Sequence, residues 1–349
     1  MAGRSRGVPG DVLIGAALLG LLALVLAGCG GLRAAGAPAG AAAESSAAPP
    51  SAPSPRVVKF GLPSVALSYM PIYLADEQGL FADHGLQAEI VTVASDAAPV
   101  AAMRGEIDFG GSAPSAIDLA LRGGTVKLVM GLFDTSPWTL LARPDVQTGA
   151  DLRGQIIAVG GPNPRAFALA GVRHLGLDPS SEVHLLNTGG TSNSLTALLS
   201  GQVAAAVVTP PYDAKAKAQG FHELLFLGDL IDFPYVALPT SQQNLAERPA
   251  LVRDTLLALL RAQRWWREHP AETIAAIAER FQVSAAEAAD AYAVFSRIMS
   301  PEGMVKESSV RAYLQAQGET EAAAGPLDRF IDSRPLQEAR RLLDRPRQH

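Results

Sequence analysis

The feature that most constrains the fold is the stretch from Phe109 to Gly124, which reads FGGSAPSAIDLALRGG. A short apolar segment runs into a glycine turn, and an apolar run from Ala116 to Leu121 follows. Glycine permits both the sharp turn and a close approach of the backbone to a ligand. Ser112 is a suitable helix N-cap, and proline is tolerated in a first helical turn. The stretch therefore predicts a strand, a tight turn and a helix.

The turn before this helix also offers candidate ligand-binding groups. Ser112, Ala113 and Ser115 would present two hydroxyls and free backbone N–H groups at the start of the helix. A helix start of this kind binds anionic or strongly polar groups. The alternative is that the two serines only cap the helix, as serine commonly does.

Apolar, β-rich segments and amphipathic segments alternate on both sides of this stretch. This alternation predicts an α/β fold, with a mostly parallel sheet and helices on both of its faces. From residue 246 onward only helices are expected. The expected strands are 57–62, 86–93, 106–109, 126–133, 155–159, 183–186, 203–208 and 223–227. The expected helices include 71–84, 116–121, 166–175, 191–199, 212–219, 251–266, 270–281, 285–299 and 305–317.

Composition excludes several classes of function. The 349 residues are 48% hydrophobic, which is enough for one or two sizeable cores. The net charge of −5 comes without a large basic patch, so nucleic acid is not an expected partner. Cys29 is the single cysteine, which excludes a disulfide framework, and the histidines show no metal-ligand spacing. No metal or cofactor is expected.

The N-terminus resembles a bacterial lipoprotein signal. Arg4 and Arg6 precede an apolar run from Val12 to Ala27, and the run ends in Leu-Ala-Gly-Cys at Cys29. The resemblance implies a signal peptide over residues 1–28 and a lipid on the Cys29 thiol, with two or more chains anchoring the protein. An ordinary secretory peptide or a single membrane anchor is the alternative. Residues 29–55 consist mainly of Ala, Gly, Ser and Pro, which predicts a flexible tether.

Four segments in order are similar to one protein family. They are VKFGLPSVALSYMPIYLADEQGLFADHGLQAEIV, MRGEIDFGGSAPSAIDLA, LRGQIIAVGGPNPRAFALAGVRHLGLD and LLSGQVAAAVVTPPYDAKAKAQG. Together they resemble the taurine/nitrate/sulfonate-type substrate-binding proteins of ABC importers, a group that binders of thiamine-pyrimidine precursors also resemble. The resemblance covers about residues 57–341.

The resemblance implies a two-lobed type II periplasmic-binding-protein fold with a helical C-terminal extension. Lobe one would consist of residues 56–134 plus 239–349, and lobe two of residues 135–238. The chain would cross between the lobes twice. The ligand would lie in the cleft, at the carboxyl ends of the strands, where open α/β sheets bind ligands.

The candidate ligand-binding residues are the polar and aromatic side chains that follow strands or lie at the crossings. Tyr69 offers a stacking face, or it packs the start of a helix. Arg165 stands at a helix start, where a positive charge opposes the helix dipole, so it either meets an anionic ligand or is a tolerated surface residue. Trp138 either packs at the hinge or contacts the ligand. The full set is Ser68, Tyr69, Ser112, Ala113, Ser115, Thr135, Asn163, Arg165, Thr209, Tyr212 and Tyr235.

The resemblance implies capture without chemistry. A monomeric, extracytoplasmic, lipid-anchored protein would close on a small ligand and deliver it to an ABC permease and its ATPase. The alternatives are a ligand-sensing module of a membrane signalling system and an enzyme similar to the fungal pyrimidine synthases. Those synthases carry a cysteine-rich motif that this sequence lacks. Arg165 and the serine turn favour a sulfonate, nitrate or other small anion, whereas the tyrosines favour an aromatic heterocycle.

Overall fold

The computed structural model describes residues 54–344 of the chain. The expected signal peptide, Cys29 and nearly all of the expected tether lie outside these residues. No helix among residues 54–344 combines the length and the apolar character needed to cross a bilayer.

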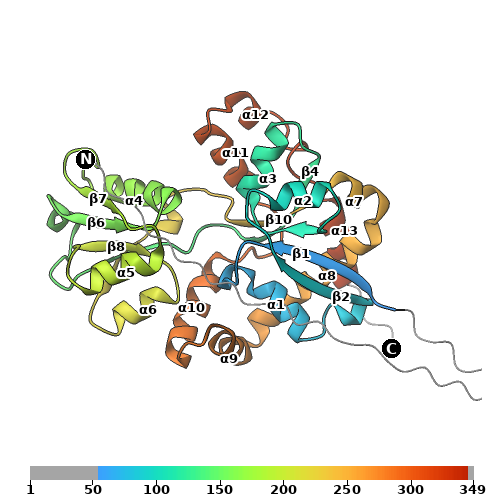
Figure 1. The fold of residues 1–349 in the computed structure, drawn as a ribbon, viewed down its shortest axis with the longest axis horizontal. Helices are drawn as coiled ribbons and strands as arrows, with labels where there is room; N and C mark the ends of the chain where they lie inside the picture. The colour runs from blue at the N-terminus through green and yellow to red at the C-terminus, as the bar shows by residue number, and fades with distance from the viewer. Residues whose placement is uncertain (1–53, 345–349) are drawn as a thin grey trace, which may run out of the picture. The chain divides into compact units, whose positions relative to one another are not determined.

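Four strands near the start of the described chain and one later strand form two small sheets. Strands β1 (Arg56–Leu62), β2 (Leu86–Thr92) and β3 (Phe109–Gly110) form a parallel sheet in the order β2-β1-β3. Strand β4 (Val126–Phe133) pairs antiparallel with β10 (Val236–Ser241), which returns from much later in the chain. We call the part built on these five strands the first lobe (Figure 1).

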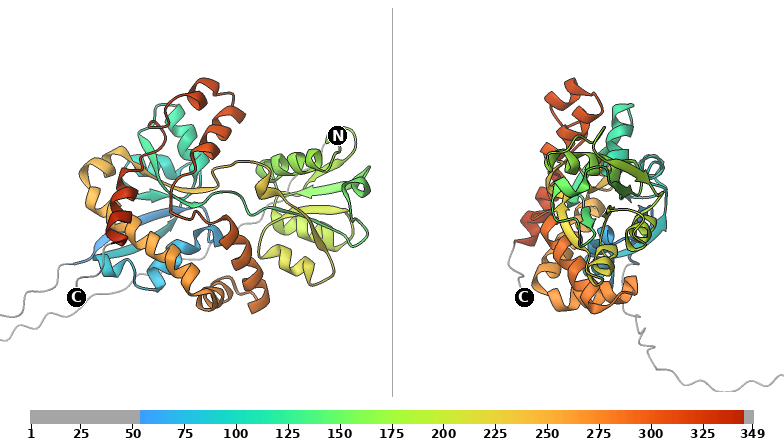
Figure 2. Two further views of the ribbon diagram at one scale, coloured as in Figure 1. Left: turned by 180° about the vertical axis from the view of Figure 1, so that it is seen from behind. Right: turned by 90° about the vertical axis from the view of Figure 1, so that its left-hand side faces the viewer.

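Helices cover the sheets of the first lobe, and most of them come from the C-terminal third of the chain (Figures 1 and 2). The N-terminal elements are η1 (Leu67–Tyr69), α1 (Met70–Glu77), η2 (Ala82–His84), α2 (Ala98–Met103) and α3 (Ala113–Leu121). The C-terminal helices are α7 (Gln242–Glu247), α8 (Pro249–Glu268), α9 (Pro270–Phe281), α10 (Ala285–Ile298), α11 (Glu307–Ala316), α12 (Thr320–Ala324) and α13 (Arg334–Leu343).

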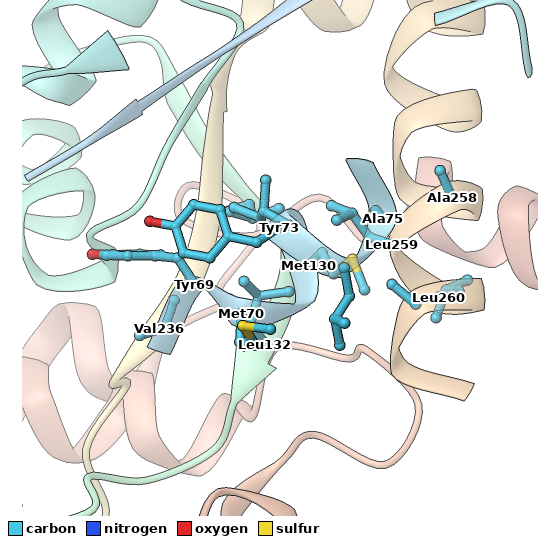
Figure 3. Packing of buried hydrophobic residues seen from close by; sticks show 14 of the residues in the cluster. Tyr69, Met70, Tyr73, Ala75, Met130, Leu132, Val236, Ala258, Leu259 and Leu260 are labelled. Atoms are coloured by element: carbon cyan, nitrogen blue, oxygen red, sulfur yellow. The ribbon is translucent and has the colours of Figure 1, made fainter. Parts of the chain in front are cut away.

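The core of the first lobe joins α1 and α8 to β4. Figure 3 shows Met70 of α1 beside Leu132 and Met130 of β4, with Leu260 of α8 completing the cluster. Met70, Met130 and Leu132 are fully buried. Each such side chain contributes about 1.5–3 kcal/mol when it leaves water. The C-terminal helix α8 is therefore an integral part of the first lobe.

The second lobe is one five-stranded mixed sheet in the order β7-β6-β8-β5-β9. Strand β6 is parallel to β7 and to β8, whereas β5 is antiparallel to β8 and β9. Its strands are β5 (Thr139–Ala142), β6 (Ile156–Val159), β7 (His184–Asn187), β8 (Ala205–Val208) and β9 (His222–Phe226). Its helical elements are η3 (Gly149–Leu152), α4 (Pro162–His174), α5 (Thr191–Leu199), α6 (Tyr212–Lys217) and η4 (Leu227–Asp229).

Two segments connect the lobes. Residues 134–138 lead from β4 to β5, and residues 230–235 lead from η4 to β10 (Figure 1). We call these segments the first crossing and the return crossing. The lobe boundaries expected from the sequence stay predictions.

The α/β class and the helical C-terminal region are confirmed, with three local corrections. The strands are not mostly parallel throughout, because β5 and β10, which were not expected as strands, pair antiparallel with their neighbours. The expected helix 71–84 is interrupted after Glu77, where Gly79 has a φ of 66°. Helix α4 begins at Pro162, earlier than expected, and α3 begins at Ala113.

Candidate ligand-binding site

The first part of the candidate site forms where β1 and β3 end. These strands are parallel, so the segments that follow them emerge at the same edge of the sheet. The Tyr69 hydroxyl, after β1, donates a hydrogen bond of 3.1 Å to the carbonyl oxygen of Gly111, after β3. A Cβ on Gly111 would lie 2.7 Å from Cε1 of Tyr69, so glycine is needed for the ring to lie here. The turns that follow β1 and β3 are therefore in direct contact.

The serine turn starts α3 as the sequence predicts. The Ser112 hydroxyl accepts a hydrogen bond of 3.5 Å from the Ser115 N–H and lies 2.9 Å from the Ser115 hydroxyl. Both side chains are partly exposed. Ala113, in contrast, is fully buried in the core against α3 and β4, so its side chain cannot meet a ligand.

Two tyrosines from different parts of the chain meet beside this turn. The Ser68 hydroxyl lies close to the Tyr235 phenol, which brings η1 beside the return crossing. Burial raises the pKa of Tyr235 to about 12, although the nearby Ser68 acts in the opposite direction. Burial also raises the pKa of Tyr69, and the nearby Tyr235 and Tyr73 add to that effect. Both phenols therefore stay neutral hydrogen-bond donors at physiological pH.

An aromatic wall continues from Tyr235 into the second lobe. Trp138 meets Tyr235 with ring centroids 6.5 Å apart and Phe167 of α4 at 4.6 Å, both edge to face. Phe167 in turn meets Phe233 at 5.8 Å. Trp138, Tyr235 and Phe233 are half-buried, whereas Phe167 is buried. We define the aromatic wall as Tyr235, Trp138, Phe167 and Phe233. It ties the two crossings to the start of α4.

Helix α4 presents Asn163 and Arg165 in its first turn. Both side chains are exposed, and Arg165 has no ion-pair partner among residues 54–344. The preceding turn is tightly packed, because a Cβ on Gly160 would lie 2.8 Å from the carbonyl carbon of Gly190. The starts of α4 and α5 therefore lie side by side. Free N–H groups of two helix starts and the guanidinium of Arg165 give this edge a positive potential.

The remaining lobe-two candidates lie at the same edge of the sheet. Strands β6, β7 and β8 run parallel, so the turns after them share one side. Thr209 and Tyr212 follow β8, and the Tyr212 N–H donates to the Thr209 carbonyl oxygen at 2.8 Å. The Tyr212 side chain packs partly against the core under α5 and α6. Contacts within the described chain do not join this pair to the aromatic wall.

The Thr135 side chain contacts η4 of the second lobe. Its hydroxyl donates a hydrogen bond of 2.6 Å to the Gly228 carbonyl oxygen. It lines a cavity of about 750 Å³ that η4 and the end of α10 also line. Thr135 therefore joins the first crossing to the second lobe, and a ligand role for it stays a prediction.

Sequence reasoning missed Phe167 and Phe233. Phe167 lies four residues after Asn163 on α4, and a phenylalanine on the apolar face of a helix is indistinguishable from a core residue in a single sequence. Phe233 precedes Pro234 in the return crossing, and this aromatic-proline pair at a crossing was the available signal.

The described chain offers no metal centre. Within residues 54–344, no group of three or more His, Cys, Asp or Glu side chains is placed to hold a metal ion. What the arrangement offers is hydroxyl donors, aromatic edges, helix starts and one unpaired guanidinium. Such groups bind and orient a small polar molecule.

A model of the family described as NMT1/THI5 like matches residues 67–273. No curated protein matches the chain by sequence.

Solved structures share the fold over most of the chain. The periplasmic aliphatic sulphonate-binding protein SsuA from Escherichia coli is 19% identical with a TM-score of 0.62, over 78% of this chain and 95% of SsuA. The periplasmic nitrate-binding protein NrtA from Synechocystis PCC 6803 is 17% identical with a TM-score of 0.62, over 84% of this chain and 90% of NrtA. The desulfurization enzyme DszB is 16% identical with a TM-score of 0.59, over 82% of this chain and 99% of DszB. These likenesses confirm the two-lobed type II fold with its helical C-terminal extension.

Proposed function

Because the chain belongs to the NMT1/THI5-like family, we propose that it is the solute-binding protein of an ABC import system. It captures a small ligand between its two lobes and delivers the ligand to a membrane permease and its ATPase. The fold it shares with sulphonate-binding and nitrate-binding periplasmic proteins supports this function. Fold alone does not determine function, so the proposal rests on the site as well.

The observation that carries the proposal is the continuity of the candidate site. The Tyr69 hydroxyl is bonded to Gly111 beside the serine turn, Ser68 lies close to Tyr235, and Tyr235 meets Trp138 in the aromatic wall. The wall includes both crossings and a residue of α4, whose first turn carries Arg165. A ligand held along this line touches both lobes at once. Contacts made only in the closed state favour closure, which is how such a protein changes its lobe equilibrium.

The ligand class we propose is a small anion. SsuA is named for aliphatic sulphonates and NrtA for nitrate, and both are small anions. In this chain Arg165, the two adjacent helix starts and the hydroxyls of Ser112 and Ser115 suit the anionic group. The aromatic wall would cover the apolar body of a sulfonate. A neutral aromatic heterocycle is the competing ligand class, and the screen below separates the two.

Location follows from the N-terminal sequence. We propose that residues 1–28 are removed as a signal peptide and that the Cys29 thiol carries a lipid on the extracytoplasmic side of the membrane. The tether would keep a monomeric folded part near its permease and raise its effective concentration there. Mass spectrometry of the membrane fraction checks this, since a diacylglyceryl group on Cys29 adds a large mass that Cys29→Ser abolishes.

An enzymatic role has one observation in its favour, the shared fold of the desulfurization enzyme DszB. Cysteine chemistry is not available to the described part of this chain, because its single cysteine is Cys29. We therefore propose binding without turnover. Recovery of the ligand chemically unchanged after incubation is the expected result.

A thermal-shift screen tests the function. The panel holds taurine, alkane and aryl sulfonates, nitrate, bicarbonate, dicarboxylates and neutral pyrimidine or flavin precursors. A ligand at about a thousand times its Kd stabilises the folded state by roughly 4 kcal/mol, which raises Tm measurably. Stabilisation by sulfonates or nitrate supports the proposal. Stabilisation only by neutral heterocycles contradicts the anion class, and conversion of a panel compound contradicts the binding role.

A further inference from the structure

The segment around the start of α11 contacts the return crossing through polar groups. The Lys306 ammonium lies 2.7 Å from a carboxylate oxygen of Asp232, and the Ser309 hydroxyl donates to the same carboxylate at 2.6 Å. Two groups from one helix start therefore hold one side chain of the crossing.

The Asp232 carboxylate lies at the start of α11, where it contacts side-chain groups. Lys306 occupies the N-cap position of this helix and makes no side-chain cap hydrogen bond. A carboxylate at a helix start interacts favourably with the helix dipole. Here the carboxylate comes from a distant part of the chain. The helix start and the return crossing therefore stabilise each other.

The next turn of α11 holds the neighbouring residue of the crossing. The ring of Tyr313 meets that of Phe233 edge to face, with centroids 6.0 Å apart. Tyr313 follows Ser309 by four residues, so both side chains lie on one face of the helix. The Tyr313 hydroxyl also donates to the Asp118 carboxylate of α3 at 3.0 Å. Figure 1 shows α11 beside α3, whose first turn is the serine turn.

Phe233 is also part of the aromatic wall. It meets Phe167 of α4, and Phe167 meets Trp138 of the first crossing. One face of α11 is thus connected through Phe233 to the second lobe, and through Asp118 to the helix that begins at the serine turn. Because Asp232 is bonded to α11 and Phe233 packs against it, the return crossing cannot rotate freely at these two residues.

We propose that Lys306, Ser309 and Tyr313 form a clamp on the return crossing that sets the angle between the lobes. Its residues touch no ligand. They are positioning residues, which fix where Phe233 and the rest of the aromatic wall stand when a ligand arrives. This inference rests on the proposed function in so far as the lobe angle controls affinity. Its first consequence, the lobe angle of the ligand-free protein, does not depend on any ligand.

The first readout is a distance between the lobes. In the full chain carrying Cys29→Ser, cysteines introduced at the exposed Thr196 of α5 and Gln243 of α7 take spin labels. Pulsed electron paramagnetic resonance then gives the distance distribution without ligand. Lys306→Met and Ser309→Ala are expected to broaden or shift this distribution. Lys306→Arg, which keeps the positive charge, is expected to give the wild-type distribution. Ser309→Ala removes one bond and no charge, so it keeps the test valid if Lys306→Met folds poorly.

The matched control is Arg340→Met. Arg340 pairs with Glu302 at 2.8 Å in the same C-terminal region, at similar side-chain exposure, and neither residue is bonded to a residue of the crossings. It is expected to leave the distance distribution unchanged. A distribution that is unchanged in both Lys306→Met and Ser309→Ala, or changed equally by Arg340→Met, overturns the clamp.

The second readout is affinity by calorimetry for two ligands of different shape from the thermal-shift screen. Lys306→Met is expected to lower the affinity for both ligands by the same factor, about five- to tenfold. A changed lobe equilibrium lowers the population of the binding-competent state, which reduces the apparent affinity of every ligand equally. Unequal factors would show direct ligand contact and overturn the positioning role. Failure of the wild-type chain to bind any compound contradicts the proposed function alone, because the distance readout still decides the clamp.

Discussion

The Tyr69 hydroxyl donates to the Gly111 carbonyl oxygen, and the Tyr69 ring fills the space that a side chain at position 111 would need. The two residues follow different strands of one parallel sheet. This contact ties the loop before α1 to the turn before α3. It thereby fixes the position of the serine turn relative to the aromatic wall.

Gly111→Ala is expected to disturb this contact. The added Cβ would lie 2.7 Å from Tyr69 Cε1 and 2.9 Å from Leu62 Cδ2, closer than packed atoms tolerate. Overpacking of this kind typically costs about 1–3 kcal/mol of unfolding free energy. Displacement of Tyr69 should also weaken ligand binding. Urea unfolding and calorimetry measure the two effects.

Gly325→Ala is the matched control for this substitution. Gly325 has a φ of −79°, and the nearest atoms to an added Cβ would be 3.4 and 3.9 Å away. Its unfolding free energy and its affinity should stay close to those of the wild type. If Gly111→Ala and Gly325→Ala have equal unfolding free energies, Tyr69 moves aside without a loss of stability.

Arg165→Gln tests the anionic ligand class. Arg165 is exposed in the first turn of α4, where a positive charge is unfavourable to the helix dipole, so its loss should not lower stability. Loss of a charge-assisted hydrogen bond is expected to weaken anion binding about tenfold or more. Calorimetry with an anion and a neutral heterocycle separates the two classes.

Arg173→Gln serves as the control on the same helix. Arg173 is exposed in the last turn of α4, at the opposite end from the candidate site. Anion affinity should be unchanged in this variant. An equal loss of affinity in both variants would indicate a general electrostatic effect of the lobe rather than a contact at the helix start.

Trp138 provides a spectroscopic test of the aromatic wall. The chain has three tryptophans, and only Trp138 belongs to the wall, since Trp265 and Trp266 lie on α8. Ligand binding beside Trp138 is expected to change the fluorescence of the protein by altering the polarity around a half-buried indole. The change should disappear in Trp138→Phe and persist in Trp265→Phe. A signal that survives in Trp138→Phe would place the ligand elsewhere.

Much of the fold is predictable because it rests on local patterns. Apolar, β-rich runs predicted β1, β2 and β4 within a residue or two, and helical periodicity predicted α8. Strands β5 and β10 were not predicted. Pro239 argues against a strand at β10, although proline is tolerated there because β10 pairs with β4 alone among the described strands. Their pairing is fixed by partners distant in sequence.

The candidate site is predictable in type but not in its connections. Strand order places the residues after β1 and β3 at one edge, which a sequence can anticipate. The sequence alone does not decide whether Tyr69 faces a ligand or the core. The structure shows Tyr69 at 5% exposure with its hydroxyl bonded, so packing is one of its roles. The pairing of Asp232 with Ser309 spans 77 residues and left no local signal.

Two carboxylates near Lys306 should give opposite pH dependences of stability. For Asp232, burial alone would raise the pKa, but the Lys306 ammonium and the nearby hydroxyls of Ser308 and Ser309 outweigh it and hold the pKa below the usual value. A depressed folded-state pKa contributes stability above the unfolded pKa, near 4, and this stability is lost as the pH falls through the folded pKa. Asp232→Asn should therefore be less stable than the wild type at pH 7, with the difference shrinking below about pH 4.

Asp134 in the first crossing should behave in the opposite way. Burial raises its pKa and Asp232 adds to the effect, while Ser300 and Lys306 act against it. An ionised carboxylate in this place opposes folding at pH 7, and the penalty shrinks as the pH falls through the folded pKa and vanishes below the unfolded pKa, near 4. Asp134→Asn should accordingly be more stable than the wild type at pH 7 and equal to it at low pH. Urea unfolding between pH 3 and 7 measures both variants, with the exposed Asp96→Asn as control. If both substitutions change the unfolding free energy at pH 7 in the same direction, the two carboxylates do not lie in different surroundings around Lys306.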